Sequence, residues 1–141
     1  MKDELKSRIK ALQVAKSDFT SAAKRSVTEL GKRRDRLVAD LKRANKRIAR
    51  MRVQTADKAA RLANASKASA LKTRAKVKEE LDELRASARA VRAEAHTMRT
   101  ELRVVREDLA EARHHLSHAL HIDRAMAKVE KAMQQRRSRK K

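Results

Sequence analysis

The chain has 141 residues, of which 39 are Lys or Arg and 18 are Asp or Glu, so it carries a net charge of +21 at pH 7. It has no Cys, Pro, Trp or Tyr, one Gly and one Phe, which excludes a disulfide framework, a thiolate zinc site and a cysteine nucleophile. Such a charge repels itself unless a polyanion neutralises it, and nucleic acid is the commonest polyanion in a cell.

The first expected element is a short amphipathic helix over residues 1–17, marked by Leu5, Ile9 and Leu12. Ser17-Asp18 is a pair that can cap a new helix. The first residues include acids and no apolar signal segment, so export is not expected. No stretch approaches 18 apolar residues, so we expect a cytoplasmic chain with no membrane-spanning helix and no membrane partner.

A basic helical arm is expected over residues 18–61. Residues 1–77 hold 23 basic and 7 acidic residues, so most of the surplus charge lies in this half. Apolar residues in the arm follow alternating steps of three and four, interrupted only by Arg34: Ala23, Val27, Leu30, Leu37, Leu41, Ala44, Ile48 and Met51. This spacing is typical of a helix that packs against a partner helix.

A turn or break is expected over residues 62–72, which are rich in Ala, Ser and Asn. The heptad of the first arm, carried forward, predicts an a position at residue 83, whereas the next apolar run has it at Leu81. Asn and Ser favour turns over helix interiors. The region from Leu62 to Ser69 is therefore the candidate break.

A coiled-coil arm is expected over residues 73–135, followed by a basic tail at 136–141. With Leu81 as a and Leu84 as d, the 3-4 repeat runs unbroken to Leu116, and Ile122, Met126, Val129 and Met133 continue it with shifted phase. The predicted oligomerisation residues lie on this stripe: Leu81, Leu84, Val91, Met98, Leu102, Val105, Leu109 and Leu116.

The fold class is all-α, with long helices in coiled-coil packing, and two pairings are open. In an antiparallel hairpin the register is undetermined, because pairing Met51 with Leu81 can be shifted by whole heptads. In a parallel dimer through residues 80–116, acidic g positions meet basic e positions of the second copy: Glu80–Arg85, Glu94–Arg99, Glu101–Arg106 and Asp108–Arg113. These pairs favour a homo-oligomer, and the two pairings can coexist as a dimer of hairpins.

The candidate binding residues are the cations of the first arm and of the tail, which would contact phosphates without sequence choice. Arg36, Arg43 and Arg50 recur every seven residues on one helical face. The full set is Lys24, Arg25, Lys32, Arg33, Arg36, Lys42, Arg43, Lys46, Arg47, Arg50, Arg52, Arg136, Arg137, Arg139, Lys140 and Lys141. One Phe and no Trp or Tyr disfavour base stacking.

Catalytic and metal sites are not expected. There is no Gly-rich phosphate loop and no nucleophile paired with a base, so we expect no enzyme, no cofactor and no small-molecule substrate. His114, His118 and His121 share a helix face at metal-ligand spacing, but no carboxylate or Cys completes the set, and exposed helix surface is the favoured interpretation.

Several strings resemble the helical N-terminal part of the bacterial histone H1-like alginate regulatory protein (AlgP) family: Leu30-Gly31-Lys32-Arg33-Arg34, Leu41-Lys42-Arg43-Ala44 and Thr73-Arg74-Ala75-Lys76 through Leu84. The resemblance implies a DNA-binding, nucleoid-associated protein. The expected function is non-sequence-specific binding of double-stranded DNA through its phosphate backbone. The alternatives are an RNA- or ribosome-binding protein and a structural scaffold or granule-associated, phasin-like protein.

Overall fold

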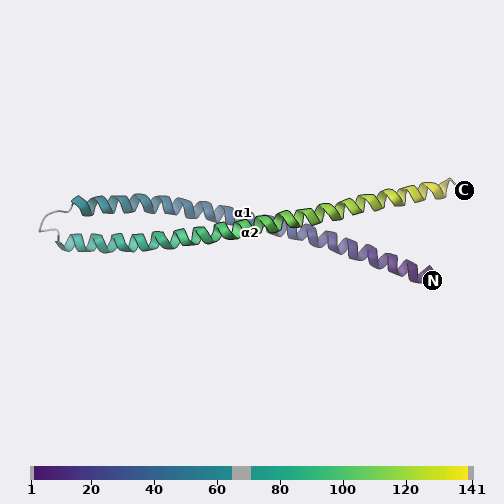
Figure 1. The fold of residues 1–141 in the computed structure, drawn as a ribbon, viewed down its shortest axis with the longest axis horizontal. Helices are drawn as coiled ribbons and strands as arrows, with labels where there is room; N and C mark the ends of the chain where they lie inside the picture. The colour runs from purple at the N-terminus through teal and green to yellow at the C-terminus, as the bar shows by residue number, and fades with distance from the viewer. Residues whose placement is uncertain (1, 65–70, 140–141) are drawn as a thin grey trace. The chain divides into compact units, whose positions relative to one another are not determined.

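The protein is all-α, as predicted. A computed structural model describes residues 2–64 and 71–139, which form two long helices, α1 (Lys2–Asn64) and α2 (Leu71–Ser138), with no strand among these residues (Figure 1). The sequence favours long helices because it is rich in Ala, Leu, Arg, Lys and Glu and has no Pro. Charges also suit the helix dipoles, with Asp3 and Glu4 in the first turn of α1 and Arg136 and Arg137 in the last turn of α2.

Some of the predicted boundaries differ from those of the helices. The separate helix over 1–17 is wrong, because α1 continues through Ser17-Asp18, where its stripe of packed positions continues through Lys16 and Thr20. The break predicted at 62–72 includes residues 62–64 and 71–72, which are helical. Its remaining part, 65–70, lies outside the described residues.

The chain divides into two units, each containing a segment of both helices. Unit 1 comprises Met1–Arg33 and Val105–Lys141, and unit 2 comprises Arg34–Val104. The division in α1 falls at Arg34, the charged residue that interrupts the apolar stripe of the first arm.

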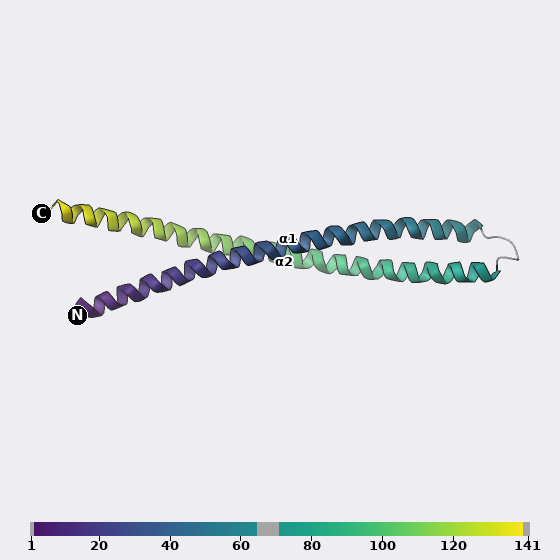
Figure 2. The ribbon, with the colours of Figure 1, turned by 180° about the vertical axis from the view of Figure 1, so that it is seen from behind.

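In unit 2 the two helices lie side by side as an antiparallel hairpin (Figures 1 and 2). Its core cluster consists of the a and d positions from both helices: Ala44, Met51, Ala88, Val91 and Ala95, with Leu41, Ile48, Leu84 and Met98 packed against them. Ala95 is fully buried. The small side chains let the helix backbones approach closely, so the 3-4 apolar repeat of each arm is satisfied within one chain.

The register of this hairpin is set by contacts that cross between the helices. Lys58 Nζ lies 2.6 Å from Glu80 Oε2, and Arg99 donates a hydrogen bond of 3.2 Å to Asn45 Oδ1. With the core cluster, these contacts bring Met51 level with Ala88, one heptad away from its pairing with Leu81. At this level the large Met51 faces the small Ala88, so the two side chains fit together without crowding.

Unit 1 continues the same stripe of packed positions on both helices. Ala23 in α1 and Val105, Leu109 and Ala119 in α2 are buried. In α2 the stripe keeps its phase through Ala119, rather than shifting as predicted, which leaves Ile122 and Val129 off the stripe. Met126 and Met133 lie on the continued phase but after Asp123, where none of the described side chains is buried, so all four residues are exposed. A shift is not needed, because the small Ala119 continues the step of three from Leu116.

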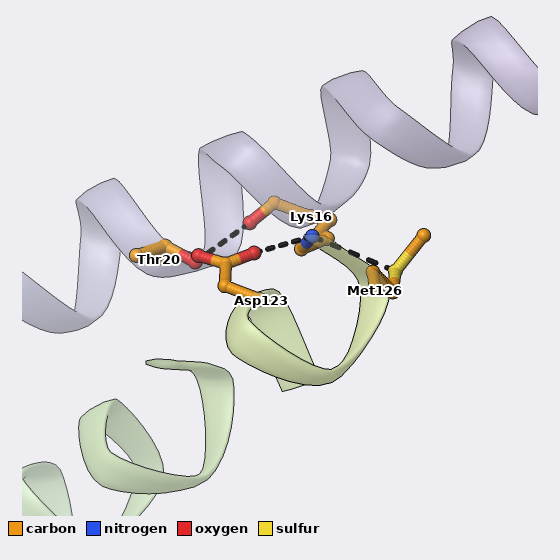
Figure 3. Close-up of polar contacts among 4 residues, drawn as sticks. All are labelled: Lys16, Thr20, Asp123 and Met126. Carbon is orange, nitrogen blue, oxygen red and sulfur yellow. Dashed lines mark hydrogen bonds and ion pairs between the residues drawn. The ribbon is translucent and has the colours of Figure 1, made fainter. Parts of the chain in front are cut away.

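A polar cluster ends the packed part of unit 1 (Figure 3). Lys16 forms an ion pair with Asp123, and its Nζ lies 3.5 Å from Met126 Sδ. Thr20 is buried but satisfied, because its hydroxyl donates to the Lys16 carbonyl oxygen at 3.0 Å. Among the described side chains, none before Lys16 or after Asp123 is buried.

We expect Ala95→Leu to destabilise the helix pair by about 1–3 kcal/mol, because the larger side chain does not fit at a fully buried position beside Ala44. Ala93→Leu, on the exposed face of the same helix, is the matched control and should be nearly neutral. Thermal and urea unfolding followed by circular dichroism measures both. Equal stability of the two variants would contradict the close approach of the helices.

The Lys58–Glu80 ion pair predicts a pH dependence of stability. The hydrogen bond and the charge of Lys58 hold the pKa of Glu80 below its ordinary value. Because the folded-state pKa is lowered, the contribution to stability is complete above the unfolded-state pKa and is lost as the pH falls through the folded-state pKa. In the Lys58→Gln variant, the pKa of Glu80 should rise towards its ordinary value. An NMR titration that follows the carboxyl carbon of Glu80 measures this change. An unchanged Glu80 pKa in that variant would show that the pair does not form.

Candidate nucleic-acid interface

The predicted binding residues lie on the outside of the helices. All fourteen that the structure describes are exposed: Lys24, Arg25, Lys32, Arg33, Arg36, Lys42, Arg43, Lys46, Arg47, Arg50, Arg52, Arg136, Arg137 and Arg139. Lys140 and Lys141 lie outside the described residues. Within this set, Arg43 is the only residue with a described carboxylate partner, Asp40. These side chains are therefore available to an external anion.

Arg36, Arg43 and Arg50 form a ladder on α1. Spaced seven residues apart, they share one helical face and span roughly 20 Å. They point away from the interface with α2, because the packed a and d positions lie elsewhere on the helix. This arrangement is a row of separate charges along one side of a single helix.

The direction of helix pairing decides which residues of α1 lie beside the basic positions of α2. In unit 2 the e positions of α2 are Arg85, Arg92 and Arg99, and its g positions are acidic or neutral. In an antiparallel pair, e positions lie beside e positions and g beside g. The e positions of α1 in this unit carry no acid: Val38, Asn45, Arg52 and Ala59. The arginines of α2 therefore lie on an edge where α1 offers no neutralising carboxylate.

On this edge a groove of about 680 Å³ opens between the two helices. Its lining includes the small side chains of Ala56, Ala59 and Ala88. Four arginines line it, Arg52 from α1 and Arg85, Arg89 and Arg92 from α2. Asp82 is its single acidic lining residue, and it lies 3.5 Å from Arg85. We call this feature the arginine groove.

The opposite edge of unit 2 has both signs of charge. There, Lys58 and Arg61 lie with Glu80 and Glu83 around a second groove. Because the charges offset one another, this edge is a weaker candidate for an anion than the arginine groove.

Of the four groove arginines, the sequence-based prediction includes Arg52 and omits Arg85, Arg89 and Arg92. It assigned Arg85 to a contact with Glu80 of a second copy, which a parallel pair would provide. The available signal was the lack of acidic residues at the e positions of α1. It becomes informative only when the pairing is known to be antiparallel.

The predicted oligomerisation residues lie in the interface between α1 and α2 of one chain. Leu81, Val91, Leu102, Val105 and Leu109 are buried there, and Leu84, Met98 and Leu116 are half-buried. One apolar stripe cannot face two partners at once, so a parallel dimer through these residues requires α2 to separate from α1. Self-association stays a prediction.

The histidines of α2 are exposed. The rings of His114 and His118 stack with centroids 6.3 Å apart, and His115 Nε2 lies 3.6 Å from Glu111 Oε1. In the described part of the chain, no three or more His, Cys, Asp or Glu side chains gather in a way that could hold a metal ion.

The comparisons with known proteins leave the chain without a family assignment. No family model, curated protein or solved structure matches it. The resemblance to the AlgP family therefore stays a prediction. Neither α1 nor α2, as far as they are described, contains a segment long and apolar enough to span a membrane.

Proposed function

We propose that this protein binds double-stranded DNA without sequence specificity, through its phosphate backbone, and so organises the nucleoid. The observation that carries the proposal is the display of surplus cations. Fourteen of the predicted basic residues are exposed, and of these fourteen only Arg43 is ion-paired with a described carboxylate. A net charge of +21 exceeds what solubility requires of a chain this small. Release of counterions from DNA would favour the complex.

The side-chain inventory favours phosphate contacts over reading of bases. Phe19, the single aromatic residue apart from histidine, lines an apolar groove in unit 1 that also contains the carboxylates of Asp108 and Glu111. Those carboxylates repel phosphates, so Phe19 is poorly placed to stack on a base. The described residues form two long helices, and the sequence shows no helix-turn-helix or zinc-finger pattern of the kind that places side chains on base edges.

Binding of a duplex should be steeply salt-dependent. If roughly 6–10 phosphates are engaged, affinity should fall by about 10³–10⁵ between 50 and 200 mM salt. Arg36→Gln/Arg43→Gln/Arg50→Gln should weaken binding to duplexes of any sequence alike and reduce the salt slope by about one per lost contact. Fluorescence anisotropy of labelled duplexes measures both quantities. A salt slope near zero for the unmodified protein would rule out the proposal.

One alternative function has an observation in its favour. Ile122, Met126, Val129 and Met133 are exposed large apolar residues near the end of α2. Apolar residues at this spacing suit contact with another apolar surface, as expected of a scaffold or granule-associated protein. An RNA- or ribosome-binding protein would use the same cations as the DNA-binding protein that we propose.

Nuclease treatment of a cell lysate separates the three functions. DNase should release a nucleoid protein from its large complexes, whereas RNase should release a ribosome-bound one. A scaffold or granule protein should sediment unchanged after either treatment. We expect release by DNase only, measured by sedimentation and immunoblotting at two salt concentrations.

A further inference from the structure

We infer that the arginine groove is a discrete binding site for neighbouring phosphate groups of one phosphate-bearing chain, held jointly by α1 and α2. That this chain is a nucleic-acid strand rests on the function proposed above. The phosphate site itself rests on the groove alone. It differs from the ladder on α1, because it is concave and needs both helices.

The charges in the groove favour an anionic ligand. Four guanidinium groups line it against the single carboxylate of Asp82. Like charges gathered on one edge repel one another, and solvent screening relieves this only in part. An anion that enters between them removes the repulsion and gains charge-assisted hydrogen bonds.

The shape of the groove favours a chain of phosphates over an isolated ion. Arg85, Arg89 and Arg92 follow one face of α2 at steps of four and three, spanning roughly 10 Å. Arg52 lines the same groove from α1, together with alanines of both helices. A volume of about 680 Å³ exceeds the needs of one phosphate and lies within the usual range of ligand sites. Because the guanidinium fork fits phosphate oxygens in pairs, several arginines can hold adjacent phosphates at once.

Two sets of variants separate site binding from bulk charge. Arg85→Gln/Arg89→Gln/Arg92→Gln removes three charges from the groove, and Arg36→Gln/Arg43→Gln/Arg50→Gln removes three from the ladder. The sets match closely, since each contains one arginine paired with an Asp three residues earlier, Arg85 with Asp82 and Arg43 with Asp40. Gln has nearly the helix propensity of Arg, so both triples should stay helical, which circular dichroism checks.

A third pair of variants tests the shape at constant charge. Ala56→Leu places a bulky side chain in the groove, whereas Ala90→Leu places the same side chain at an exposed position of α2 that does not line the groove. If the shape of the groove admits the ligand, only Ala56→Leu should weaken binding.

The first measurement uses inorganic tripolyphosphate as the probe and the Nε–Hε signals of the arginines in NMR spectra of the whole protein. We expect saturable shifts at Arg52, Arg85, Arg89 and Arg92 that exceed those of the ladder arginines, and their loss in Ala56→Leu. Small shifts spread evenly over all arginines, or shifts that persist unchanged in Ala56→Leu, would overturn the phosphate site.

The second measurement uses duplex DNA and identifies the source of the phosphates. We expect the groove triple to bind at least about tenfold more weakly than the ladder triple at the same salt concentration. Equal weakening of the two triples would overturn the groove as a nucleic-acid site while leaving the proposed function standing. Failure of the unmodified protein to bind duplex DNA would overturn the proposed function, and the tripolyphosphate shifts would still decide the phosphate site.

Discussion

The direction in which α2 packs against α1 is the constraint that decides which surfaces of unit 2 are charged. The apolar a and d positions can be buried by a partner in either direction, so they do not choose between a parallel and an antiparallel pair. The flanking positions differ, because antiparallel packing places the e positions of both helices on one edge and the g positions on the other. In this chain Arg85, Arg92 and Arg99 of α2 are at e, whereas Glu80, Glu94 and Glu101 are at g. Antiparallel pairing therefore separates charges that a parallel dimer would bring together.

Alanines make up nearly half of the core that maintains this pairing. Among the described residues, five of the eleven buried apolar residues are alanines, each of which removes little apolar area from water. Stability must therefore accumulate over many layers, and no single layer contributes much. Ion pairs across the helices, such as Lys58–Glu80, add orientation more than free energy, because exposed pairs are worth little. The pairing of the two helices therefore depends on their register and on the close fit of alanines such as Ala44 and Ala95.

The sequence predicted the helices and most of their packed faces, because a 3-4 repeat from Leu81 to Leu116 has few alternative structures. It did not predict the register, since Met51 fits against Leu81 by hydrophobicity and against Ala88 by volume, and hydrophobic periodicity cannot distinguish the two. It missed Thr20 and Ala119 as packed positions. Thr20 is polar, so a search for apolar residues passes over it, although its hydroxyl is satisfied by the Lys16 carbonyl oxygen. The arginine groove was missed for a different reason. Arg52 and Arg85 are far apart in sequence, and only the pairing of the helices places them around one groove.

If the groove binds phosphates as inferred above, ligand binding would be linked to folding. Gathering Arg52, Arg85, Arg89 and Arg92 on one edge opposes the pairing of the helices, because the charges repel most when α1 and α2 are together. A phosphate chain that bridges both helices binds the paired state and not the separated one. By mass action, such a ligand stabilises the hairpin by an amount that grows with its concentration. On the proposed function, an alanine-rich core of limited strength is then sufficient, because nucleic acid supplies the stabilisation that the core lacks.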